Sequence, residues 1–208
     1  MKYRSLAIAG AVALACSLAA VTRAGEDKQQ EFERAKAGLE KAKLTLAEAV
    51  EAASKKVPDG KAVEAEIETE AGGAAFEVEV VSGTKHLEVK VDADNGDILG
   101  VEEEVEEEEE ARKGEKKPDD EQLENEAAAT SKISLLHAIR TASKEVEGGK
   151  PFEASFARHN GLLAIEVELL DGSEIKEVFV DAQTGAVLEV KQEFTEDMDD
   201  EGEDESDL

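Results

Sequence analysis

The segment VDADNGDIL, from Val91 to Leu99, carries carboxylates whose spacing resembles that of a calcium-binding loop. Such a loop needs oxygen ligands at its first, third and fifth positions and a glycine at its sixth. With Gly96 at the sixth position, the first and third positions fall on Val91 and Ala93, whose side chains hold no oxygen. The segment therefore does not fit the calcium loop.

A second version of this segment, VDAQTGAVL, runs from Val180 to Leu188 and keeps only one carboxylate, Asp181. The two versions share the pattern D-A-x-x-G. An Asp side chain accepts hydrogen bonds from the backbone that follows it, and a Gly tolerates positive φ, so the pattern suits a tight connection between two strands. We predict a turn at both places in preference to a metal site.

Histidines are the other side chains suited to catalysis or zinc binding, and the chain has three of them. His86, His137 and His159 fall on different predicted elements, and none of them has a histidine at the equivalent position in the other copy of the repeat described below. An active site needs its acid, base or nucleophile held in one convergent arrangement. We therefore expect the histidines at surface or edge positions, and we expect no catalytic residues, no cofactor and no metal centre.

Glutamates at alternate positions form a further group of candidates. In the strands proposed below they would all project from the uncovered side of the sheet, where a solvated face is the simplest interpretation. The other interpretation is a binding surface for a basic protein segment or for divalent cations. The candidate partner-binding residues are Glu64, Glu66, Glu77, Glu79, Glu88, Glu153, Glu166, Glu168 and Glu177.

An internal repeat determines how these residues are positioned. Moving residues 44–101 forward by 89 positions places them on residues 133–190 without a gap, and about two-fifths of the aligned residues are identical. A fixed period of this kind indicates that one structural unit occurs twice. Two copies of a single small module are predicted.

Each copy begins with a helical pattern and continues with strands. Apolar residues recur at spacings of three and four in residues 46–57 and 135–146, which predicts one apolar stripe on a helix. Thr45 and Glu48 form a candidate capping box, and Ser134 takes the capping position in the second copy. The remainder of each copy alternates apolar and polar residues, with glycines between the segments, as antiparallel hairpins require.

The fold class predicted is α+β, with two tandem modules that each pack one helix on a three- to four-stranded antiparallel meander sheet. The boundaries follow from these patterns and from charge runs. We expect an N-terminal helical extension at 25–43, modules at 44–103 and 131–194, an acidic linker at 104–130 that is helical towards its end, and a disordered acidic tail at 195–208.

The first 24 residues have the layout of a secretory signal peptide. Lys2 and Arg4 precede a short apolar run, and small residues lead to a cleavage site between Ala24 and Gly25. The run is too short to span a bilayer, so the mature chain is expected to lack a transmembrane segment. Cys16 leaves a lipid-anchored alternative open. We predict a periplasmic or secreted protein.

The charge of the chain restricts its partners. The formal net charge is −28, with 52 Asp and Glu against 24 Lys and Arg. Such a chain repels nucleic acid and anionic lipid and attracts cations or basic proteins. Nucleic acid is excluded as a partner, whereas weak calcium binding by the acidic linker and tail remains an alternative.

Each copy resembles a PepSY domain, a small module found beside the propeptides of thermolysin-like metallopeptidases and in many bacterial extracytoplasmic proteins. The residues that carry the resemblance are TLAEAVEAASKKVPDGK and SLLHAIRTASKEVEGGK, the strand segments FEVEV and IEVEL, and the two D-A-x-x-G segments. The resemblance implies an α+β module in an extracytoplasmic location and a role in restraining peptidases.

The sequence thus predicts a non-enzymatic, secreted or periplasmic protein that acts as a protein-interaction or regulatory module. Its partner would be a protein or peptide, either a peptidase or a basic segment. The alternative is an acidic protein of the cell envelope that binds or buffers divalent cations.

Overall fold

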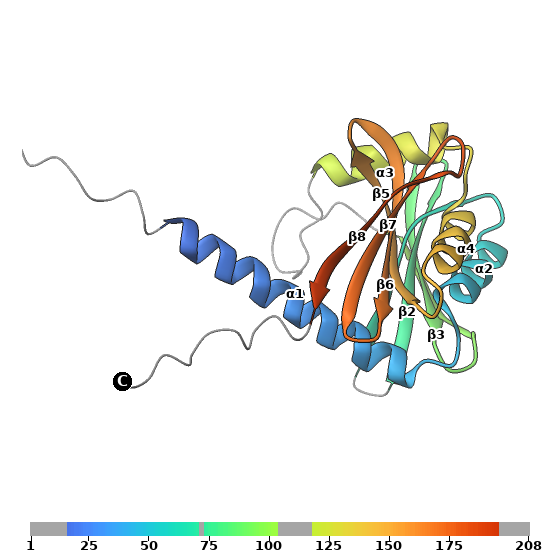
Figure 1. The fold of residues 1–208 in the computed structure, drawn as a ribbon. Helices are drawn as coiled ribbons and strands as arrows, with labels where there is room; N and C mark the ends of the chain where they lie inside the picture. The colour runs from blue at the N-terminus through green and yellow to red at the C-terminus, as the bar shows by residue number, and fades with distance from the viewer. Residues whose placement is uncertain (1–15, 71–72, 104–117, 196–208) are drawn as a thin grey trace, which may run out of the picture.

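The computed structural model describes residues 16–70, 73–103 and 118–195, which form four helices and eight strands (Figure 1). The elements of the first half are α1 (Cys16–Lys41), α2 (Leu46–Lys56), β1 (Lys61–Glu70), β2 (Gly73–Ser82), β3 (Lys85–Asp92) and β4 (Ile98–Glu103). Those of the second half are α3 (Pro118–Thr130), α4 (Leu135–Glu145), β5 (Lys150–His159), β6 (Leu162–Asp171), β7 (Glu174–Asp181) and β8 (Val187–Thr195). The α+β class is confirmed.

All eight strands belong to one antiparallel sheet, in the order β4-β3-β2-β1-β5-β6-β7-β8. Each half contributes a four-stranded meander, and the first strands of the two halves, β1 and β5, pair with each other. The sequence patterns predicted one sheet for each module. In the structure the two meanders instead continue into one another, because β1 and β5 each have a free side after the hairpin with the following strand has formed.

The pairing of β1 with β5 is reciprocal. Ala65 lies opposite Ala154, its counterpart in the repeat, and Glu66 lies opposite Glu153. The residue after Ala65 on β1 lies opposite the residue before Ala154 on β5, and the residue before Ala65 lies opposite the residue after Ala154. A two-fold axis imposes this relation on an interface. The joint between the two halves is self-complementary.

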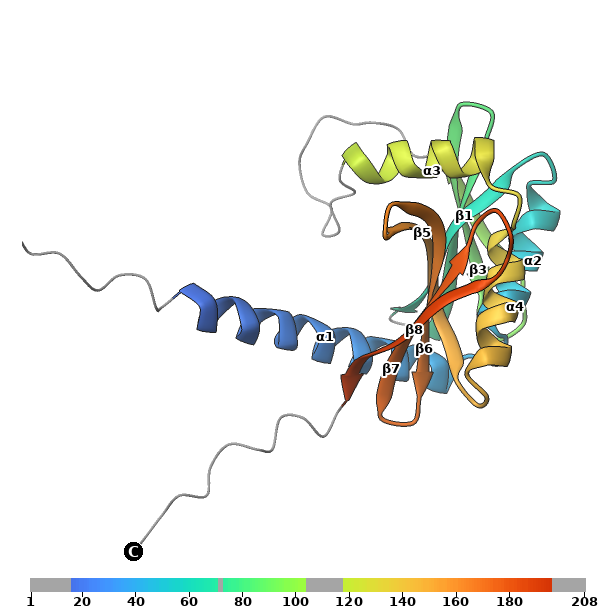
Figure 2. The same ribbon diagram turned by 45° about the horizontal axis from the view of Figure 1, so that its top comes forward.

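Helices α2 and α4 cover one face of the sheet, side by side (Figure 2). The apolar stripes predicted for them are buried, at Leu46, Ala49, Val50 and Ala53 in α2 and at Leu135, Ala138, Ile139 and Ala142 in α4. Together with alternate strand residues they form one core. Burial of each large aliphatic side chain contributes about 1.5–3 kcal/mol, so this core holds the helices on the sheet.

Both helices start at the predicted caps. Thr45 Oγ1 accepts a hydrogen bond from the Glu48 amide, and the Glu48 carboxylate accepts one from the Thr45 amide at 2.8 Å. These hydrogen bonds from the backbone and hydroxyl of Thr45 lower the pKa of Glu48. Ser134 caps α4 through the amide of His137 alone.

Replacing Thr45 with alanine is expected to lower the free energy of unfolding by about 1–2 kcal/mol, because the Thr45 hydroxyl accepts a hydrogen bond from the Glu48 amide and donates one to the Glu48 carboxylate, and both are lost. The matched variant Ser134→Ala removes a single hydrogen bond and should have the smaller effect, about 1 kcal/mol. Urea unfolding of the two variants measures the difference. Equal effects would contradict a contribution from the hydrogen bond that the Thr45 hydroxyl donates to the Glu48 carboxylate.

The D-A-x-x-G segments are turns, as predicted. Asp92 Oδ1 accepts a hydrogen bond from the amide of Asp94, and Asp181 Oδ1 accepts one from the amide of Gln183, both at 2.8 Å. Gly96 and Gly185 have φ of 80° and 76°, a region that side chains with a Cβ rarely adopt. The aspartates are thus occupied with the backbone of their own turn.

Helices α1 and α3 lie on the other side of the sheet, α1 near one end and α3 near the other (Figure 2). Phe32 and Ala35 of α1 are buried, and the Phe32 ring lies 5.4 Å from that of Phe194 in β8. The last residues of α1 and α3, Lys41 and Thr130, are separated by the period of the repeat. The repeated structural unit therefore begins with these helices, earlier than sequence identity indicates.

Several predicted segments fall on parts of the chain that the structure does not describe. Residues 1–15 of the predicted signal peptide, residues 104–117 of the predicted linker and residues 196–208 of the predicted tail lie outside the described residues. The predicted cleavage site at Ala24 and Gly25 falls within α1. In the described ranges, no helix has the length and apolar character needed to cross a membrane.

Lys61 of β1 fixes the end of α3 against the sheet. Its ammonium donates to the carbonyl oxygens of Ala127, Ala128 and Ser131, the last at 2.7 Å. A cation at a helix C-terminus is favourable because the last carbonyls lack intrahelical partners. Partial burial of this ammonium lowers the pKa of Lys61.

The variant Lys61→Met is expected to loosen the last turn of α3 by about 1 kcal/mol, because the three carbonyls lose a charged donor. Lys150, its counterpart in the repeat, is exposed, so Lys150→Met is the matched control. Hydrogen exchange of the amides of Leu123 to Thr130 provides the readout. Exchange that is unchanged in Lys61→Met, or equally faster in both variants, would contradict the capping role.

Candidate functional site

Five glutamates form a continuous row across the middle of the sheet, on the face opposite α2 and α4. Each lies directly opposite the next in neighbouring strands, in the order Glu77, Glu66, Glu153, Glu168 and Glu177. A lysine follows at each end, because Lys90 is opposite Glu77 and Lys191 is opposite Glu177. We call these five residues the glutamate row.

The row is an unfavourable arrangement of charge unless it is compensated. Like charges directly opposite one another on paired strands destabilise a sheet, and the row has four such contacts in succession. Lys90 compensates at one end, where its Nζ lies 2.7 Å from Glu77 Oε1. The interior of the row has to be compensated in another way.

Helix α1 supplies part of that compensation. Lys28 Nζ lies 3.6 Å from Glu168 Oε1 and donates a hydrogen bond to Glu31. The positive charge of Arg34 also acts on Glu66. The segment after the predicted cleavage site therefore behaves as an internal basic partner of the row, although Glu31 adds one further carboxylate to it.

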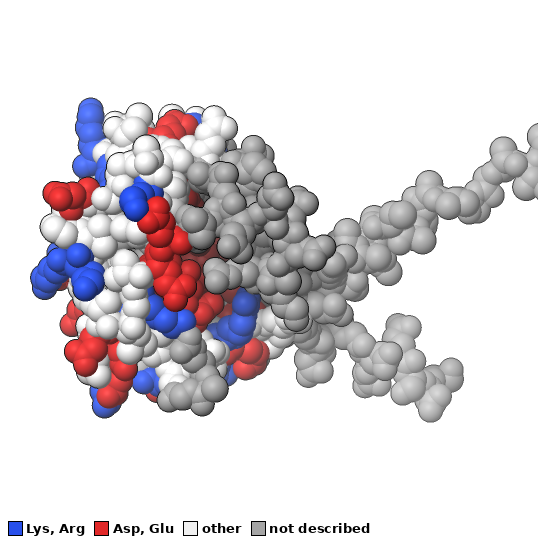
Figure 3. Space-filling model, turned by 180° about the vertical axis from the view of Figure 1, so that it is seen from behind, with Lys and Arg blue, Asp and Glu red and all other residues white. Residues whose placement is uncertain are grey.

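The glutamates of this face are less exposed than the sequence patterns predicted. Glu168 and Glu177 are buried, and the other seven candidate glutamates are half-buried. The prediction of a freely solvated face was wrong because α1 and α3 lie over it, whereas the modules alone would have left it open. Acidic side chains do gather in a stripe on the surface seen from behind (Figure 3).

Burial and crowding keep the middle of the row protonated at neutral pH. Burial, followed by the charges of Glu66 and Glu31, raises the pKa of Glu153 to about 8. Burial, a hydrogen bond with Glu31 and the charge of Glu153 raise the pKa of Glu168 to about 10. Desolvation disfavours the charged form, and a neighbouring carboxylate adds to the effect.

Glu177, at one end of the row, and Glu68, beside the row, titrate closer to neutral pH. Burial and the charge of Glu166 raise the pKa of Glu177 to about 7, and burial and the charge of Glu77 raise that of Glu68 to about 7. Burial and the charge of Glu77 also raise the pKa of Glu66. A set of carboxyl groups of this kind can share protons, accept a basic side chain or hold a cation in place of the protons.

The sequence did not identify the residues that complete this face from the helices. Lys28, Glu31 and Arg34 come from α1, and Glu124 comes from α3. Their pattern along each helix carried no signal, because charged residues there are equally typical of a solvated helix face. In the sequence, Phe32, Ala35 and Leu39 are spaced as on one side of a helix, which favours packing of α1 on the sheet without indicating which charged residues face it.

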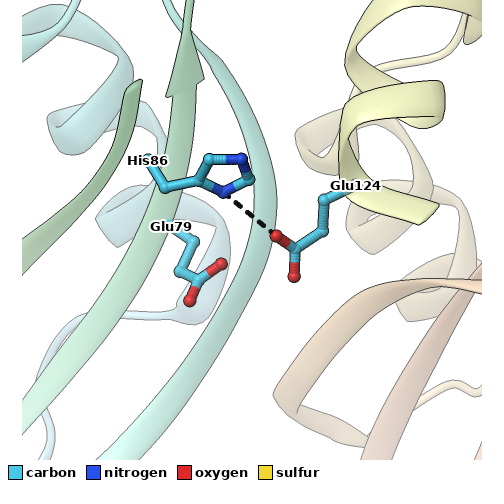
Figure 4. A group of neighbouring side chains, drawn as sticks. All are labelled: Glu79, His86 and Glu124. Carbon is cyan, nitrogen blue, oxygen red and sulfur yellow. Dashed lines mark ion pairs between the residues drawn. The ribbon is translucent and has the colours of Figure 1, made fainter. Parts of the chain in front are cut away.

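The three histidines have different environments. His137 is exposed on α4, and His159 lies near the β8 edge, 3.1 Å from Glu189, with its ring stacked on Phe179. His86 is buried, contrary to the surface or edge position predicted for it, because α3 lies over the β2–β3 hairpin. Its Nδ1 lies 3.2 Å from Glu124 Oε2 (Figure 4).

The outer strands of the sheet expose the same apolar side chains. Leu99 and Val101 of β4 are 54% and 39% exposed, and their repeat counterparts in β8, Leu188 and Val190, are 36% and 42% exposed. In the described part of the chain, no other strand pairs with the outer side of β4 or β8. An unpaired edge with apolar side chains is a template for strand pairing with another chain.

The family model described as "Peptidase propeptide and YPEB domain", PepSY, matches residues 43–102 and 132–191. Each matched range begins just before α2 or α4 and ends in β4 or β8. The two ranges together account for more than half of the chain. No curated protein sequence gave a match.

Two solved structures are similar to the chain. A crystal structure of a candidate lipoprotein from Clostridium difficile 630 is 20% identical, with a TM-score of 0.42, over 73% of this chain and 95% of that one. The C-terminal domain of YpeB from Bacillus megaterium is 17% identical, with a TM-score of 0.27, over 73% of this chain and 66% of that one.

Proposed function

Since the chain belongs to the PepSY family and carries two tandem copies of the domain, we propose that it is a non-catalytic protein-interaction module that restrains a peptidase outside the cytoplasm. The family description supplies the link to peptidases. The layout of residues 1–24 supports secretion, with cleavage between Ala24 and Gly25 or, alternatively, lipidation at Cys16.

The pair of equivalent edge strands is the observation that supports this function best. Leu99 and Val101 recur as Leu188 and Val190 at the two ends of one sheet, so the duplication has kept two exposed apolar edges. Monomeric proteins usually protect such edges with charge, proline or a covering segment. We propose that each edge accepts an extended segment of the peptidase as an additional strand.

Strand addition would restrain the peptidase by holding that segment away from its folded position. Backbone hydrogen bonds would supply most of the affinity, and contacts with Leu99 or Leu188 would favour segments with apolar side chains. The half-buried glutamates outside the row, such as Glu64 and Glu88, are proposed to contact basic residues of the same partner. The negative charge of the chain would speed the approach of a basic segment.

Site-directed photo-crosslinking tests this proposal. A photoreactive amino acid would be placed at Leu99, at Leu188 and, as a control, at the exposed Lys55 of α2, and the full chain would be irradiated in cell-envelope extract of the source organism. We expect a secreted peptidase to be captured from the edge positions and not from Lys55. The full chain should inhibit that peptidase, and Leu99→Lys combined with Leu188→Lys should weaken inhibition about tenfold or more, since a charge opposes strand addition.

Two outcomes would count against the peptidase role. One is capture of proteins without peptidase activity from both edges. The other is capture of a peptidase with equal yield from the control position, which would show that the edges are not the contact. In either case the sheet edges would not carry the proposed function.

Cation buffering is a second candidate, favoured by one observation in the row. Glu31, Glu153 and Glu168 each place a carboxylate oxygen within 4.8 Å of the other two, and Glu168 is buried. Calorimetric titration with Ca²⁺ separates the two candidates. Saturable binding with a dissociation constant below about 10⁻⁴ M, lost in Glu168→Gln, would favour buffering.

A further inference from the structure

Side chains from three elements converge where α3 crosses the β2–β3 hairpin. Glu79 comes from β2, His86 from β3 and Glu124 from α3, and both glutamate carboxylates lie on the Nδ1 side of the histidine ring (Figure 4). One donor atom from each residue lies within 4.8 Å of the donor atoms of the other two. His86 and Glu124 are 8% and 5% exposed, and Glu79 is half-buried.

The orientation of the imidazole ring is informative about this cluster. His86 Nε2 lies 3.3 Å from Asn125 Oδ1, and His86 Nδ1 lies 3.2 Å from Glu124 Oε2. When Nε2 donates its hydrogen to the amide oxygen, Nδ1 presents a lone pair to the carboxylate. Two acceptor atoms at that separation need a positive charge between or beside them, which a proton or a metal ion can supply.

The geometry points to a metal ion: we propose that Glu79, His86 and Glu124 bind a divalent transition metal of the zinc class through His86 Nδ1 and one carboxylate oxygen from each glutamate. Donor atoms bound to one tetrahedral zinc lie about 3.3 Å apart, which agrees with the His86–Glu124 separation. Asn125 would orient the ring through its other nitrogen, the arrangement in which metal-binding histidines are usually held. Water would complete the coordination.

The donor types restrict the metal. Imidazole nitrogen suits zinc, copper, iron and nickel better than calcium or magnesium, which prefer oxygen ligands alone. The other acidic groups of the sheet consist only of carboxylates, such as Glu166 with Glu168 and Glu177. The histidine therefore distinguishes this cluster from the remainder of the acidic face.

The repeat indicates one such site per chain. At the position of His86 the second half has Ile175, and at the position of Glu124 helix α1 has Ala35. Only the counterpart of Glu79, which is Glu168, keeps a carboxylate. The metal would thus connect α3 to the hairpin of the first half, while α1 packs on strands of both halves through apolar contacts and Lys28.

The proposal is tested by calorimetric titration of the full chain with Zn²⁺. An excess of Mg²⁺ is present throughout, so that binding sites made only of oxygen ligands are already occupied. We expect one Zn²⁺ per chain at the high-affinity step. His86→Ile introduces the residue that the second half already carries in the same place, and Glu124→Gln keeps the shape of the side chain. Each should weaken this step roughly 100-fold or more, because loss of an outer-shell partner alone weakens metal sites by about 10–100-fold.

A control and a second readout separate a metal site from a simple ion pair. His137→Gln removes an exposed histidine and should leave the Zn²⁺ titration unchanged. In two-bond ¹H–¹⁵N spectra, Zn²⁺ should shift the Nδ1 resonance of His86 while Nε2 stays protonated. Co²⁺ should give the visible absorption of a bound ion in the wild type and in His137→Gln, and not in His86→Ile or Glu124→Gln. Circular dichroism verifies that the variants are folded.

Three results would overturn the proposal. The first is the absence of a high-affinity step in the wild type, which would leave His86 and Glu124 as an ion pair. The second is a step that survives in both His86→Ile and Glu124→Gln, which would assign the metal to surface carboxylates. The third is a Zn²⁺-dependent shift of His137 or His159 with none at His86. Because these readouts do not involve a peptidase, they are independent of the function proposed above.

Discussion

The free energy of unfolding is expected to fall as the pH rises from about 5 to about 9, because the glutamate row holds protons that the unfolded chain releases. The unfolded pKa of a glutamate is about 4.3. In the folded protein the pKa of Glu153 is raised to about 8 and that of Glu168 to about 10, mainly by burial. Above about pH 4.3 the folded state therefore binds more protons than the unfolded state.

The direction of the effect follows from proton linkage. Groups with a raised folded pKa contribute stability that is fully present below the unfolded pKa and is lost as the pH rises through the folded pKa. Each additional proton held by the folded state changes the free energy of unfolding by about 1.4 kcal/mol per pH unit. Each of these losses begins above the unfolded pKa of about 4.3 and is complete near the folded pKa, which is about 7 for Glu177 and Glu68 and about 8 for Glu153.

Acidification below about pH 4 should lower stability again. Hydrogen bonds to the ionised forms lower the pKa of Glu48 and Asp181, and such groups contribute stability only above their unfolded pKa. The pH of maximum stability is therefore expected near 5. Urea unfolding at a series of pH values, at high salt to screen the surface charges, measures the profile. Stability that is constant or rising between about pH 5 and 9 would contradict it.

The variant Glu168→Gln tests whether this pH dependence of the free energy of unfolding comes from the glutamate row. The amide cannot ionise, so the variant should be more stable than the wild type by about 1–3 kcal/mol at about pH 8 and should differ little at about pH 5. Glu145→Gln, on the exposed face of α4, changes the net charge equally and is the matched control. If both variants shift the profile by the same amount, the effect belongs to overall charge and not to Glu168.

Phe32→Ala is expected to be the most destabilising substitution in α1, with a loss of about 3–5 kcal/mol at the pH of maximum stability. The side chain is fully buried, packs against Phe194 of β8, and has the Lys36 ammonium 5.2 Å from its ring centre. It anchors α1 where the helix crosses the second half of the sheet. A loss of this size is a large share of the 5–15 kcal/mol that is typical of a domain.

Hydrogen exchange of the α1 amides shows whether the helix has detached. Phe194→Ala is the control, because Phe194 is only half-buried and its loss should destabilise less. Detachment of α1 would also admit water to Glu168, so the pH dependence described above should become weaker in Phe32→Ala. Normal protection of α1 together with a loss below about 1 kcal/mol would show that other contacts hold the helix.

Local sequence patterns were sufficient to predict the helices, caps and turns of each half. The caps at Thr45 and Ser134, the buried stripes of α2 and α4 and the turns at Asp92 and Asp181 are where the patterns placed them. Each depends on contacts within a few residues or on one periodicity, so the signal is present in a short segment. The PepSY resemblance rests on these same segments.

The arrangement of the candidate site depends on contacts that no short segment encodes. Alternation showed that the glutamates share one face, but it could not show that α1 and α3 cover that face. Glu124 and His86 are 38 positions apart, and Lys28 and Glu168 are 140 apart, so their meeting depends on how the two halves join. That joint itself was not visible, because β1 and β5 carry no pattern that distinguishes them from the other strands.

The self-complementary joint at Ala65 and Ala154 has a consequence for how such a protein can arise. A chain with one copy would end its sheet at an unpaired β1, and two such chains could join by a true two-fold rotation into a homodimer whose formation depends on concentration. Gene duplication makes the same pairing intramolecular, so the sheet assembles however dilute the protein is. The copies are then free to diverge, as His86 and Ile175 already have.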